Sequence, residues 1–189
     1  VKTVKIGSQV WMAENLSVSH FRNGDVIPLA KNADEWEIAG ETTKPISRVL
    51  EDNPVNEKKY GRYYNWYAAT DSRGVCPAGF HVPSKAEWEV LINTIGGLAA
   101  SGRKLRSKES WKQQAGTNDY GFNALPMGSV SSGGTRFDGV GGSVGFWSST
   151  PQNNKYVWYF SLLYDDSNSY NGLNRYPREA GRTIRCIQD

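Results

Sequence analysis

Hydrophobic positions recur with a helical period in one stretch near the middle of the chain. The apolar residues of this stretch are spaced to fall on a single helix face: Trp88, Leu91, Ile92 and Ile95. Ser84 followed by Glu87 is the sequence of a capping box, in which each side chain satisfies a free backbone N–H at the start of a helix. A glycine pair at 96–97 ends the pattern. Residues 84–95 are therefore predicted to form a helix that packs its Trp88 face onto a sheet.

Alternating and turn-rich segments predict strands toward both ends of the chain. Near the N-terminus, residues 3–6 and 10–13 flank Gly7-Ser8-Gln9 and predict a hairpin. Toward the C-terminus, the expected order is strand, turn, polar strand, turn and closing strand over residues 156–164, 165–167, 168–175, 177–181 and 182–188. Because side chains alternate along a strand, the sequence leaves open which face of these strands is exposed.

The remaining segments have weaker patterns. A short helix around Trp36 is predicted over residues 33–39, and few other regular elements are expected in residues 19–59. The aromatic residues 60–70 allow a helix preceded by a strand at Tyr60-Gly61-Arg62, and the glycine-rich residues 101–145 are predicted to be loop. Since neither a repeat nor a low-complexity linker interrupts the chain, residues 1–189 are predicted to be a single α+β domain.

Composition and charge exclude several classes of protein. Aromatic residues make up 12% of the 189 residues, which excludes a disordered chain. Four of the tryptophans are assigned to the core: Trp11, Trp66, Trp88 and Trp147. A net charge of +3 with dispersed basic residues argues against a nucleic-acid-binding protein. The sequence also lacks an apolar run of about 18 residues, so no membrane span is expected, and a start at Val1 without a signal-like stretch is interpreted as a mature or trimmed chain.

The chain has two cysteines, Cys76 before the predicted helix and Cys186 in the closing strand. A disulfide between them is favoured, because two cysteines and a secreted character agree. Two buried free thiols are the alternative that the sequence leaves open.

The sequence offers little support for catalysis or metal binding. The two histidines are His20 and His81, and a structural hydrogen bond is expected for His81 because it lies directly before the helix. The sequence has no nucleophile elbow, no phosphate-binding loop with its Lys-Ser/Thr ending, and no convincing zinc ligand set. Asp165-Asp166 is interpreted as a solvated turn rather than a calcium site. We therefore expect a protein without catalytic activity, metal or cofactor.

The strongest functional signal is the density of Asn, Tyr and Ser in residues 151–178. Recognition surfaces use this mixture, since rigid aromatic rings supply contact area and small amides and hydroxyls adapt to the partner. Asn is also depleted in strands, so its abundance in predicted strands argues for function. The residues predicted to contact a protein or glycan ligand are Tyr156, Trp158, Tyr159, Tyr164, Asn168, Tyr170, Asn171, Asn174 and Arg175.

Six ordered motifs resemble one family of bacterial surface and secreted proteins, the Fibrobacter succinogenes major paralogous domain. They are VKIGSQVWMAENL at 4–16, YGRYYNWYA at 60–68, CPAGFHVPSKAEW at 76–88, GFNALP at 121–126, FWSST at 146–150 and IRC at 184–186. The resemblance implies a C-type-lectin-like fold with paired terminal strands, one or two helices and a long-loop region that presents the binding surface.

Two further similarities bear on function. Residues 83–88 are similar to formylglycine-generating sulfatase-modifying enzymes, which share that fold, but the positions of Cys76 and Cys186 depart from the cysteine pair of those enzymes and argue against oxidase chemistry. The calcium-binding motifs of animal C-type lectins are absent from the sequence. Residues 151–178 also look like the variable region that diversity-generating retroelements create, because such elements yield Asn, Tyr, Ser and Asp.

From the sequence we expect a non-enzymatic binding module that is extracellular or on a bacterial cell surface, recognises a protein or glycan, and is diversified by a retroelement. A relative of the sulfatase-modifying enzymes and a structural surface or pilus-associated domain are the alternatives.

Overall fold

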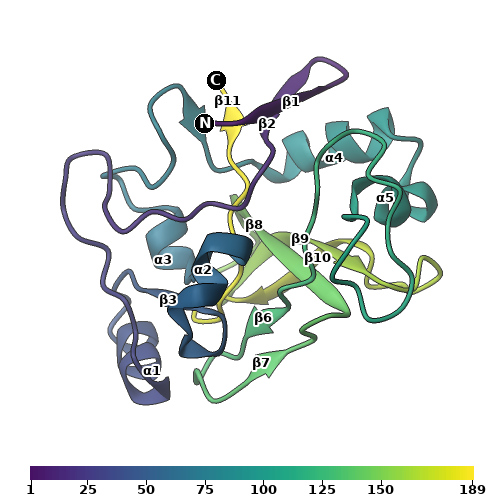
Figure 1. Cartoon of the computed structure of the whole chain (residues 1–189). Coiled ribbons are helices and arrows are strands. Elements are labelled where there is room, and N and C mark those ends of the chain that lie inside the picture. Colours follow the sequence, from purple (N-terminus) through teal and green to yellow (C-terminus); the bar gives the residue numbers. More distant parts are fainter.

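The computed structural model in Figure 1 describes the backbone of residues 1–189 and all side chains except those of residues 98, 100 and 101. The chain has a mixed α/β fold in which short helices alternate with small antiparallel sheets. Its two termini lie side by side, because β11 (Ile187–Gln188) pairs with β2 (Gln9–Met12) through Ile187 and Trp11. The predicted pairing of terminal strands is therefore confirmed.

The terminal strands belong to a four-stranded sheet in the order β1-β2-β11-β5, with β1 at Thr3–Ile6 and β5 at Phe80–His81. The predicted hairpin is confirmed, with Ile6 opposite Gln9 across a turn of Gly7 and Ser8. Gly7 has a φ of +62°, a conformation that residues with a Cβ adopt rarely, so glycine suits this turn. Gln9 belongs to the second strand rather than to the turn.

A second, three-stranded sheet lies at the centre of the molecule in the order β10-β9-β8. Its strands are β8 (Ser143–Pro151), β9 (Tyr156–Leu163) and β10 (Gly172–Pro177), all antiparallel. On one face, Phe146 and Phe160 lie opposite each other and pack against Trp88, whose ring centroid is 4.8 Å from that of Phe160. This face forms the main hydrophobic core.

Helix α4 (Lys85–Thr94) covers that face of the sheet and confirms the predicted helix. Ser84 and Glu87 make both hydrogen bonds of the capping box. All four apolar residues predicted to face the core are buried: Trp88, Leu91, Ile92 and Ile95. The glycine pair ends the helix as expected, with the N–H of Gly97 donating to the carbonyl of Ile92.

The helix around Trp36 is also confirmed, as α1 (Ala33–Glu41), but residues 19–60 hold more regular structure than predicted. Strand β3 (Ser47–Val49) pairs with β4 (Arg62–Tyr64), and a 3-10 turn at Leu50–Asp52 leads into α2 (Pro54–Tyr60). Helix α2 has no buried residue, so it carries no apolar period that the sequence could reveal. Its start is nevertheless encoded, since Asn53 caps it and Pro54 takes its first position.

The predicted helix over residues 60–70 is only partly correct, and the predicted loop over 101–145 is interrupted. The first region divides into β4 and the short helix α3 (Trp66–Ala69). The second contains the end of α5 (Leu98–Leu105) and a small pair of strands, β6 (Ser129–Val130) and β7 (Phe137–Asp138).

The C-terminal strands start later than predicted. Residues 164–171 form a turn, and β10 begins only at Gly172 rather than at 168. Of residues 182–188, only Ile187–Gln188 is a strand, while Arg182 and Thr183 make single bridges to Tyr64 and Phe146. The sequence overestimated both strands because polar turn residues can satisfy the same alternating pattern.

The predicted disulfide is confirmed, with Cys76 bonded to Cys186 and their Cα atoms 6.1 Å apart. It ties the segment before α4 to the last strand. Trp11, Trp66 and Trp147 are buried together with Trp88, as assigned from the sequence.

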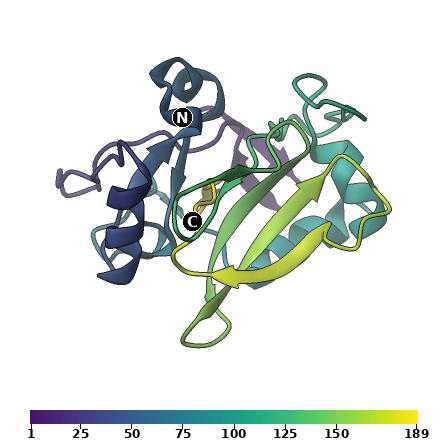
Figure 2. The same ribbon diagram turned by 90° about the horizontal axis from the view of Figure 1, so that it is seen from below.

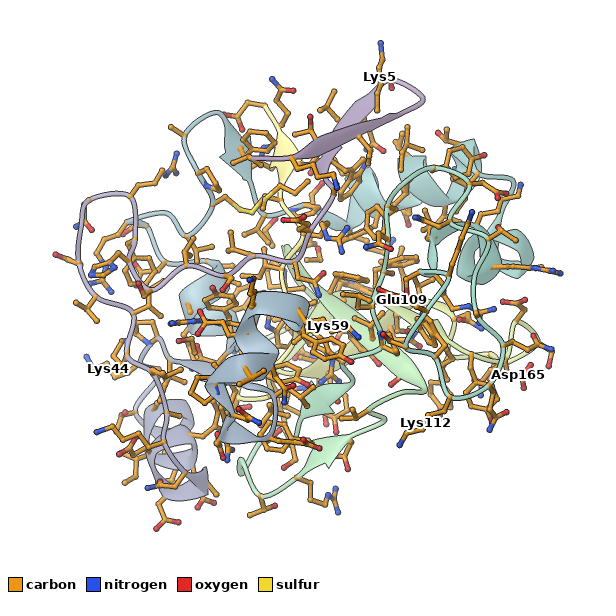
Figure 3. The ribbon with its side chains drawn as sticks, in the orientation of Figure 1. Lys5, Lys44, Lys59, Glu109, Lys112 and Asp165 are labelled. Atoms are coloured by element: carbon orange, nitrogen blue, oxygen red, sulfur yellow. A yellow bond between two sulfur atoms is a disulfide. The ribbon has the colours of Figure 1, made fainter. Side chains whose placement is uncertain are left out.

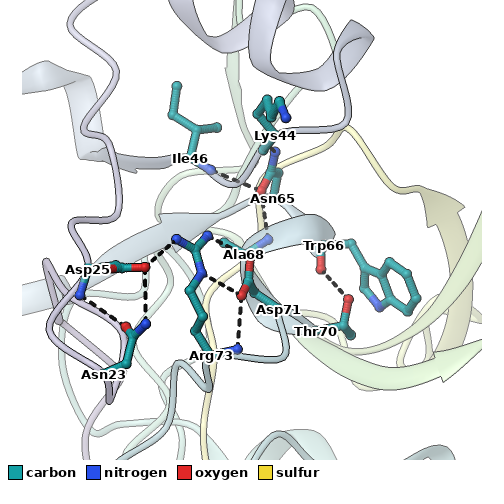
Figure 4. A network of polar contacts seen from close by, with 10 residues as sticks. All are labelled: Asn23, Asp25, Lys44, Ile46, Asn65, Trp66, Ala68, Thr70, Asp71 and Arg73. Carbon is teal, nitrogen blue, oxygen red and sulfur yellow. Dashed lines mark hydrogen bonds and ion pairs between the residues drawn. The ribbon is translucent and has the colours of Figure 1, made fainter.

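A polar network holds the long N-terminal loop against the segment after α3 (Figure 4). Arg73 donates to Asp71 at 2.8 and 2.9 Å and to Asp25 at 2.9 Å, while its guanidinium lies over the ring of Phe21. Nearby, Asn65 caps α3 and also binds the backbone of residues 44 and 46. Loops without regular hydrogen bonding are thus fixed by side chains.

Among the helices that the structure describes, none combines the length and the apolar character needed to cross a membrane.

Candidate functional site

The face of the β8–β9–β10 sheet opposite α4 is the part of this sheet that helices leave open. Figure 2 views the molecule from below, with these strands in front and no helix drawn across them. We call this side of the sheet the outer face. By the strand register, the residues whose side chains lie on it are Ser143, Gly145 and Trp147 of β8, Val157, Tyr159, Ser161 and Leu163 of β9, and Gly172, Asn174 and Tyr176 of β10. At one end of the outer face, Trp147 and Val157 are buried in a second hydrophobic cluster with Tyr64 and Ile184. At the other end, Ser143, Gly145, Ser161 and Leu163 line a hollow.

The hollow at that end of the outer face has a volume of about 140 Å³. We call it the outer hollow. Its floor includes Gly145 and Ser161, and its walls include Ser129 beside β8, Tyr159, Tyr170 and Arg182. A volume well below that of a typical small-molecule pocket, which is on the order of 300–1,000 Å³, fits one projecting group rather than a whole drug-sized ligand.

Arg182 forms one wall of the outer hollow and is only 4% exposed. Its guanidinium carbon lies 4.6 Å from the ring centroid of Tyr159 and 4.4 Å from that of Tyr176. Gly145 provides the space for this side chain, because a Cβ at that position would lie 2.8 Å from the Nε of Arg182. The two tyrosine rings therefore hold the arginine above Gly145, where a residue with a side chain would clash with it.

Tyr170 stands at the rim of the hollow on the turn between β9 and β10, and it is 64% exposed. The turn is held from within: the backbone N–H of Tyr170 donates to Asn168 Oδ1 at 2.9 Å, and the N–H of Leu163 donates to Asn171 Oδ1 at 2.8 Å. Ser167 donates to Asp165 with its hydroxyl and its backbone N–H, and these hydrogen bonds lower the pKa of the Asp165 carboxyl. Asp165 itself lies at the edge of the molecule (Figure 3).

Asn174 connects the turn to the strand beneath it. Its Nδ2 donates to Ser161 Oγ at 2.9 Å and to the carbonyl of Tyr170 at 2.7 Å. Ser161 Oγ also donates to the carbonyl of Tyr170. Asn174 therefore positions Tyr170 over the outer face.

The structure divides the residues predicted to bind a ligand among four places. Tyr159, Tyr170 and Asn174 lie at the outer face. By the strand register, Tyr156, Trp158 and Arg175 lie on the opposite side of the sheet. There, the Nζ of Lys85 is 5.0 Å from the ring centroid of Trp158. Tyr164 packs against the main core, and Asn168 and Asn171 shape the turn.

Asn171 requires a correction, because it is buried and cannot present its amide at the surface. Its Nδ2 donates to the carbonyl of Asp165 at 2.7 Å while its Oδ1 accepts from Leu163. Of the five asparagines in residues 151–178, Asn174 alone lies in a strand, so asparagine is not abundant in these strands, contrary to the prediction. Asn153, Asn168 and Asn171 accept backbone hydrogen bonds in turns, which is where asparagine is favoured.

Several residues of the outer hollow lie outside residues 151–178 and were missed from the sequence: Ser129, Ser143, Gly145 and Arg182. They come from β6, β8 and the segment before β11, which only the tertiary structure brings together. One signal was present for Arg182. A charged residue in a segment expected to close the core needs a partner or a polar function there.

A second hollow, of about 320 Å³, opens on another side between the N-terminal loop, α2 and the 109–125 segment. Lys59 and Glu109, both labelled in Figure 3, line it, as does Arg185. Burial lowers the pKa of Arg185 to about 9, and its guanidinium donates to Asn15 Oδ1 and to the carbonyls of Met12 and Phe122. Since these acceptors occupy the guanidinium, Arg185 joins three chain segments rather than facing a ligand.

His81 is engaged in the structural hydrogen bonding predicted for it. Its Nε2 lies 2.7 Å from Glu87 Oε1, and its Nδ1 lies 2.7 Å from Asp189 Oδ1. Burial disfavours the imidazolium, but the hydrogen bonds with Asp189 and Glu87 outweigh that effect and raise the pKa of His81. Among the side chains that the structure describes, no three His, Cys, Asp or Glu residues converge as a metal site would require.

A family model supports the resemblance found in the motifs. The model described as the Fibrobacter succinogenes major domain matches residues 4–188, nearly the whole chain. No curated protein and no solved structure matches the chain.

Proposed function

The chain belongs to the Fibrobacter succinogenes major domain family, and we propose that it is a non-enzymatic ligand-binding module of a bacterial surface or secreted protein. The ligand, a protein or a glycan, contacts the outer hollow. One observation carries the proposal: aromatic, hydroxyl and guanidinium groups from four chain segments converge on the outer hollow.

The construction of the rim supports recognition. Tyr170 is an exposed aromatic ring on a turn whose backbone is tied down by Asn168 and Asn171. A ring that is already fixed loses little conformational freedom when a partner binds, which favours affinity. Tyr159 and Ser129 supply hydroxyl groups with no hydrogen-bond partner among the described residues, so both hydroxyls are available to a ligand.

We further propose that the fold is C-type-lectin-like. The pairing of β2 with β11 joins the two ends of the chain, and long segments with little regular structure surround the central sheet. The disulfide between Cys76 and Cys186 supports an extracellular or cell-surface location, because such bonds persist in oxidising compartments.

We propose that diversification by a retroelement acts on fewer positions than the whole of residues 151–178. Asn153, Asn168 and Asn171 hold turns together, so free variation there would cost the turn its hydrogen bonds. Tyr159 and Tyr170 are the positions where variation would change the hollow most directly. Finding a reverse-transcriptase gene and a template repeat beside this gene would support the hypothesis, and their absence from that DNA would reject it.

The proposed function is tested by two variants of the hollow and one matched control. Tyr170→Ala removes the rim ring and Ser129→Tyr fills the hollow, whereas Tyr156→Ala removes a tyrosine whose register places it on the other side of the sheet. On a glycan array and a protein microarray, we expect both hollow variants to lose at least tenfold in affinity for whatever the wild type binds, and the control to keep it.

Equal binding by all the folded variants would show that the hollow is not the site. Loss in the Tyr156→Ala control alone would place the site on the side of the sheet that carries Trp158 and Arg175. If the wild type binds nothing on either array, the structural surface domain becomes the better description, and turnover of a sulfatase-type substrate peptide would instead favour the enzyme alternative.

A further inference from the structure

Arg182 differs from the other buried arginines in what surrounds its charge. Three of them pair with a carboxylate within 3.2 Å, and Arg185 donates to an amide and two carbonyls. The three paired arginines are Arg48, Arg62 and Arg106. Arg182 makes one hydrogen bond, from Nη1 to the carbonyl of its neighbour Gly181 at 3.0 Å, and no carboxylate of the described residues lies within 4.0 Å of it.

The aromatic rings around Arg182 do not replace a counter-charge. Tyr159 and Tyr176 lie against the guanidinium, with Trp147 a little farther at 5.8 Å. An arginine that stacks on a ring uses the face of its planar group, and its N–H donors point outward in the plane. Nε and Nη2 have no hydrogen-bond partner among the described residues, and the side chain lines the outer hollow. A nearly buried cation thus offers free donors to whatever enters.

The charge of Arg182 is almost enclosed and has no counter-ion, and an anion that enters the hollow would supply one. Carboxylate geometry suits this site, because two oxygens can accept from a guanidinium side by side. We therefore propose that the outer hollow binds a carboxylate group, with Arg182 as the recognition residue. This inference rests on the proposed function and specifies its ligand.

The surroundings favour an acidic sugar over an acidic protein as the source of the carboxylate. A stable protein interface needs roughly 800 Å² from each partner with an apolar centre. Here the exposed large apolar residues are scattered, and Tyr170 is the one of them that lines the hollow. A sugar ring needs less: an aromatic face to cover its apolar side and hydroxyls beside it, which Tyr159, Tyr170 and Ser129 supply. The ligand we infer is a glycan that carries a uronic or other carboxylated sugar.

Gly145 strengthens the assignment to Arg182, since any side chain there would displace the guanidinium and the ring of Tyr159. Gly145→Ala is thus a second way to disturb the site without removing the charge.

The experiment compares carboxylated glycans with the same glycans after their carboxyl groups have been reduced to primary alcohols. Oligogalacturonides, glucuronate-containing and sialylated oligosaccharides serve as probes, with a poly-glutamate peptide of similar charge as the protein counterpart. Arg182→Met keeps the volume and the apolar contact with the rings but removes the charge. Arg175→Met is the matched control, because it makes the same change at an exposed position on the other side of the same sheet.

We expect the wild type to bind at least one carboxylated glycan at least tenfold more tightly than its reduced form. Arg182→Met should abolish that preference, and Arg175→Met should keep it. If Arg182→Met fails to fold, the same loss of preference in Gly145→Ala, and the wild-type comparison of acidic with reduced glycans, still decide the question.

Three outcomes would overturn the inference. Equal binding of acidic and reduced glycans, with Tyr170→Ala still impaired, would refute carboxylate recognition while leaving the proposed function intact. Binding of poly-glutamate alone would assign the hollow to an acidic protein. Binding of none of the probes, together with unchanged behaviour of every hollow variant on the arrays, would remove both the inference and the proposed function.

Discussion

Asn65 lies fully buried between β4 and α3, and its amide group serves three backbone groups (Figure 4). Its Oδ1 accepts from the N–H groups of Ile46 at 3.2 Å and Ala68 at 3.0 Å, and its Nδ2 donates to the carbonyl of Lys44 at 2.7 Å. A buried polar group that loses its partner costs about 1–3 kcal/mol. A single side chain thus joins the loop before β3 to the start of α3.

Replacing Asn65 by Ala should lower the free energy of unfolding by about 3 kcal/mol, because several backbone groups lose their partner in a place that excludes water. Urea denaturation measures the change. Asn154→Ala is the control: this residue is exposed, has no side-chain hydrogen bond among the described residues, and should change stability by less than about 0.5 kcal/mol. Equal effects of the two substitutions would contradict the role assigned to Asn65.

At the scale of elements, the start of α4 is linked to the last strand through His81. The ring lies between Glu87, which belongs to the capping box, and Asp189, which follows β11. The pKa of His81 is raised, so this group contributes stability below its unfolded pKa of about 6.5 and loses it as the pH rises through the folded pKa. For Glu87, burial is outweighed by hydrogen bonds from Ser84 and His81, which lower its pKa, so its contribution is lost toward acidic pH.

We therefore expect the urea midpoint of the wild type to fall between pH 6 and pH 9, and His81→Gln to flatten that fall. The substitution keeps a polar side chain but cannot take up the proton. His20→Gln is the matched control, since His20 makes its side-chain hydrogen bond to Ser19, and it should keep the wild-type dependence. A fall of unchanged size in His81→Gln would assign the pH dependence to other groups.

Helices α2 and α4 illustrate two ways in which an element is encoded. Helix α4 carries both an apolar face and a capping box, so the spacing of its apolar residues and its N-terminal capping residues indicate the same helix. Helix α2 carries only the start signal of Asn53 and Pro54, because none of its residues is buried. The limits of α2 are therefore set by its capping residues: Asn53 Oδ1 accepts a hydrogen bond from the N–H of Val55 at the start, and Gly61 follows the last turn.

At the scale of the whole molecule, the disulfide closes a loop across a sequence separation of 110 residues. It joins Cys76, which precedes α4, to Cys186, next to the strand that pairs with β2. The backbone N–H of Met12 also donates to the carbonyl of Cys186 at 3.0 Å. Both termini and the main helix are thereby fastened at one place.

Replacing both cysteines by Ser should lower stability by up to about 5 kcal/mol, because closing so long a loop removes conformational entropy from the unfolded chain. Urea denaturation of the two forms measures the loss, and a thiol count on the denatured wild type should find no free thiol. A loss below about 1 kcal/mol, or two titratable thiols, would contradict the bond or its role.

The sequence by itself determined the elements whose signals are local. The hairpin at the N-terminus, the helices around Trp36 and Trp88, the strand predicted over 156–164 and observed at Tyr156–Leu163, and the buried tryptophans follow from period, caps and turn residues. The pairing of Cys76 with Cys186 was also accessible, because the chain offers no other pair. The first group of features depends on residues close in sequence, and the disulfide was favoured over two free thiols because only one pairing was possible.

The tertiary structure alone decided which side of β9 is open, and therefore which predicted residues can meet a ligand. Tyr159 and Trp158 are neighbours in sequence yet lie on opposite faces, and only the position of α4 determines which face is covered. Arg182 joins the site from a distant segment because its bridge to Tyr64 and the space above Gly145 bring it there. The hollow forms where segments far apart in the sequence meet, and no local pattern of apolar and polar residues records which distant segments meet.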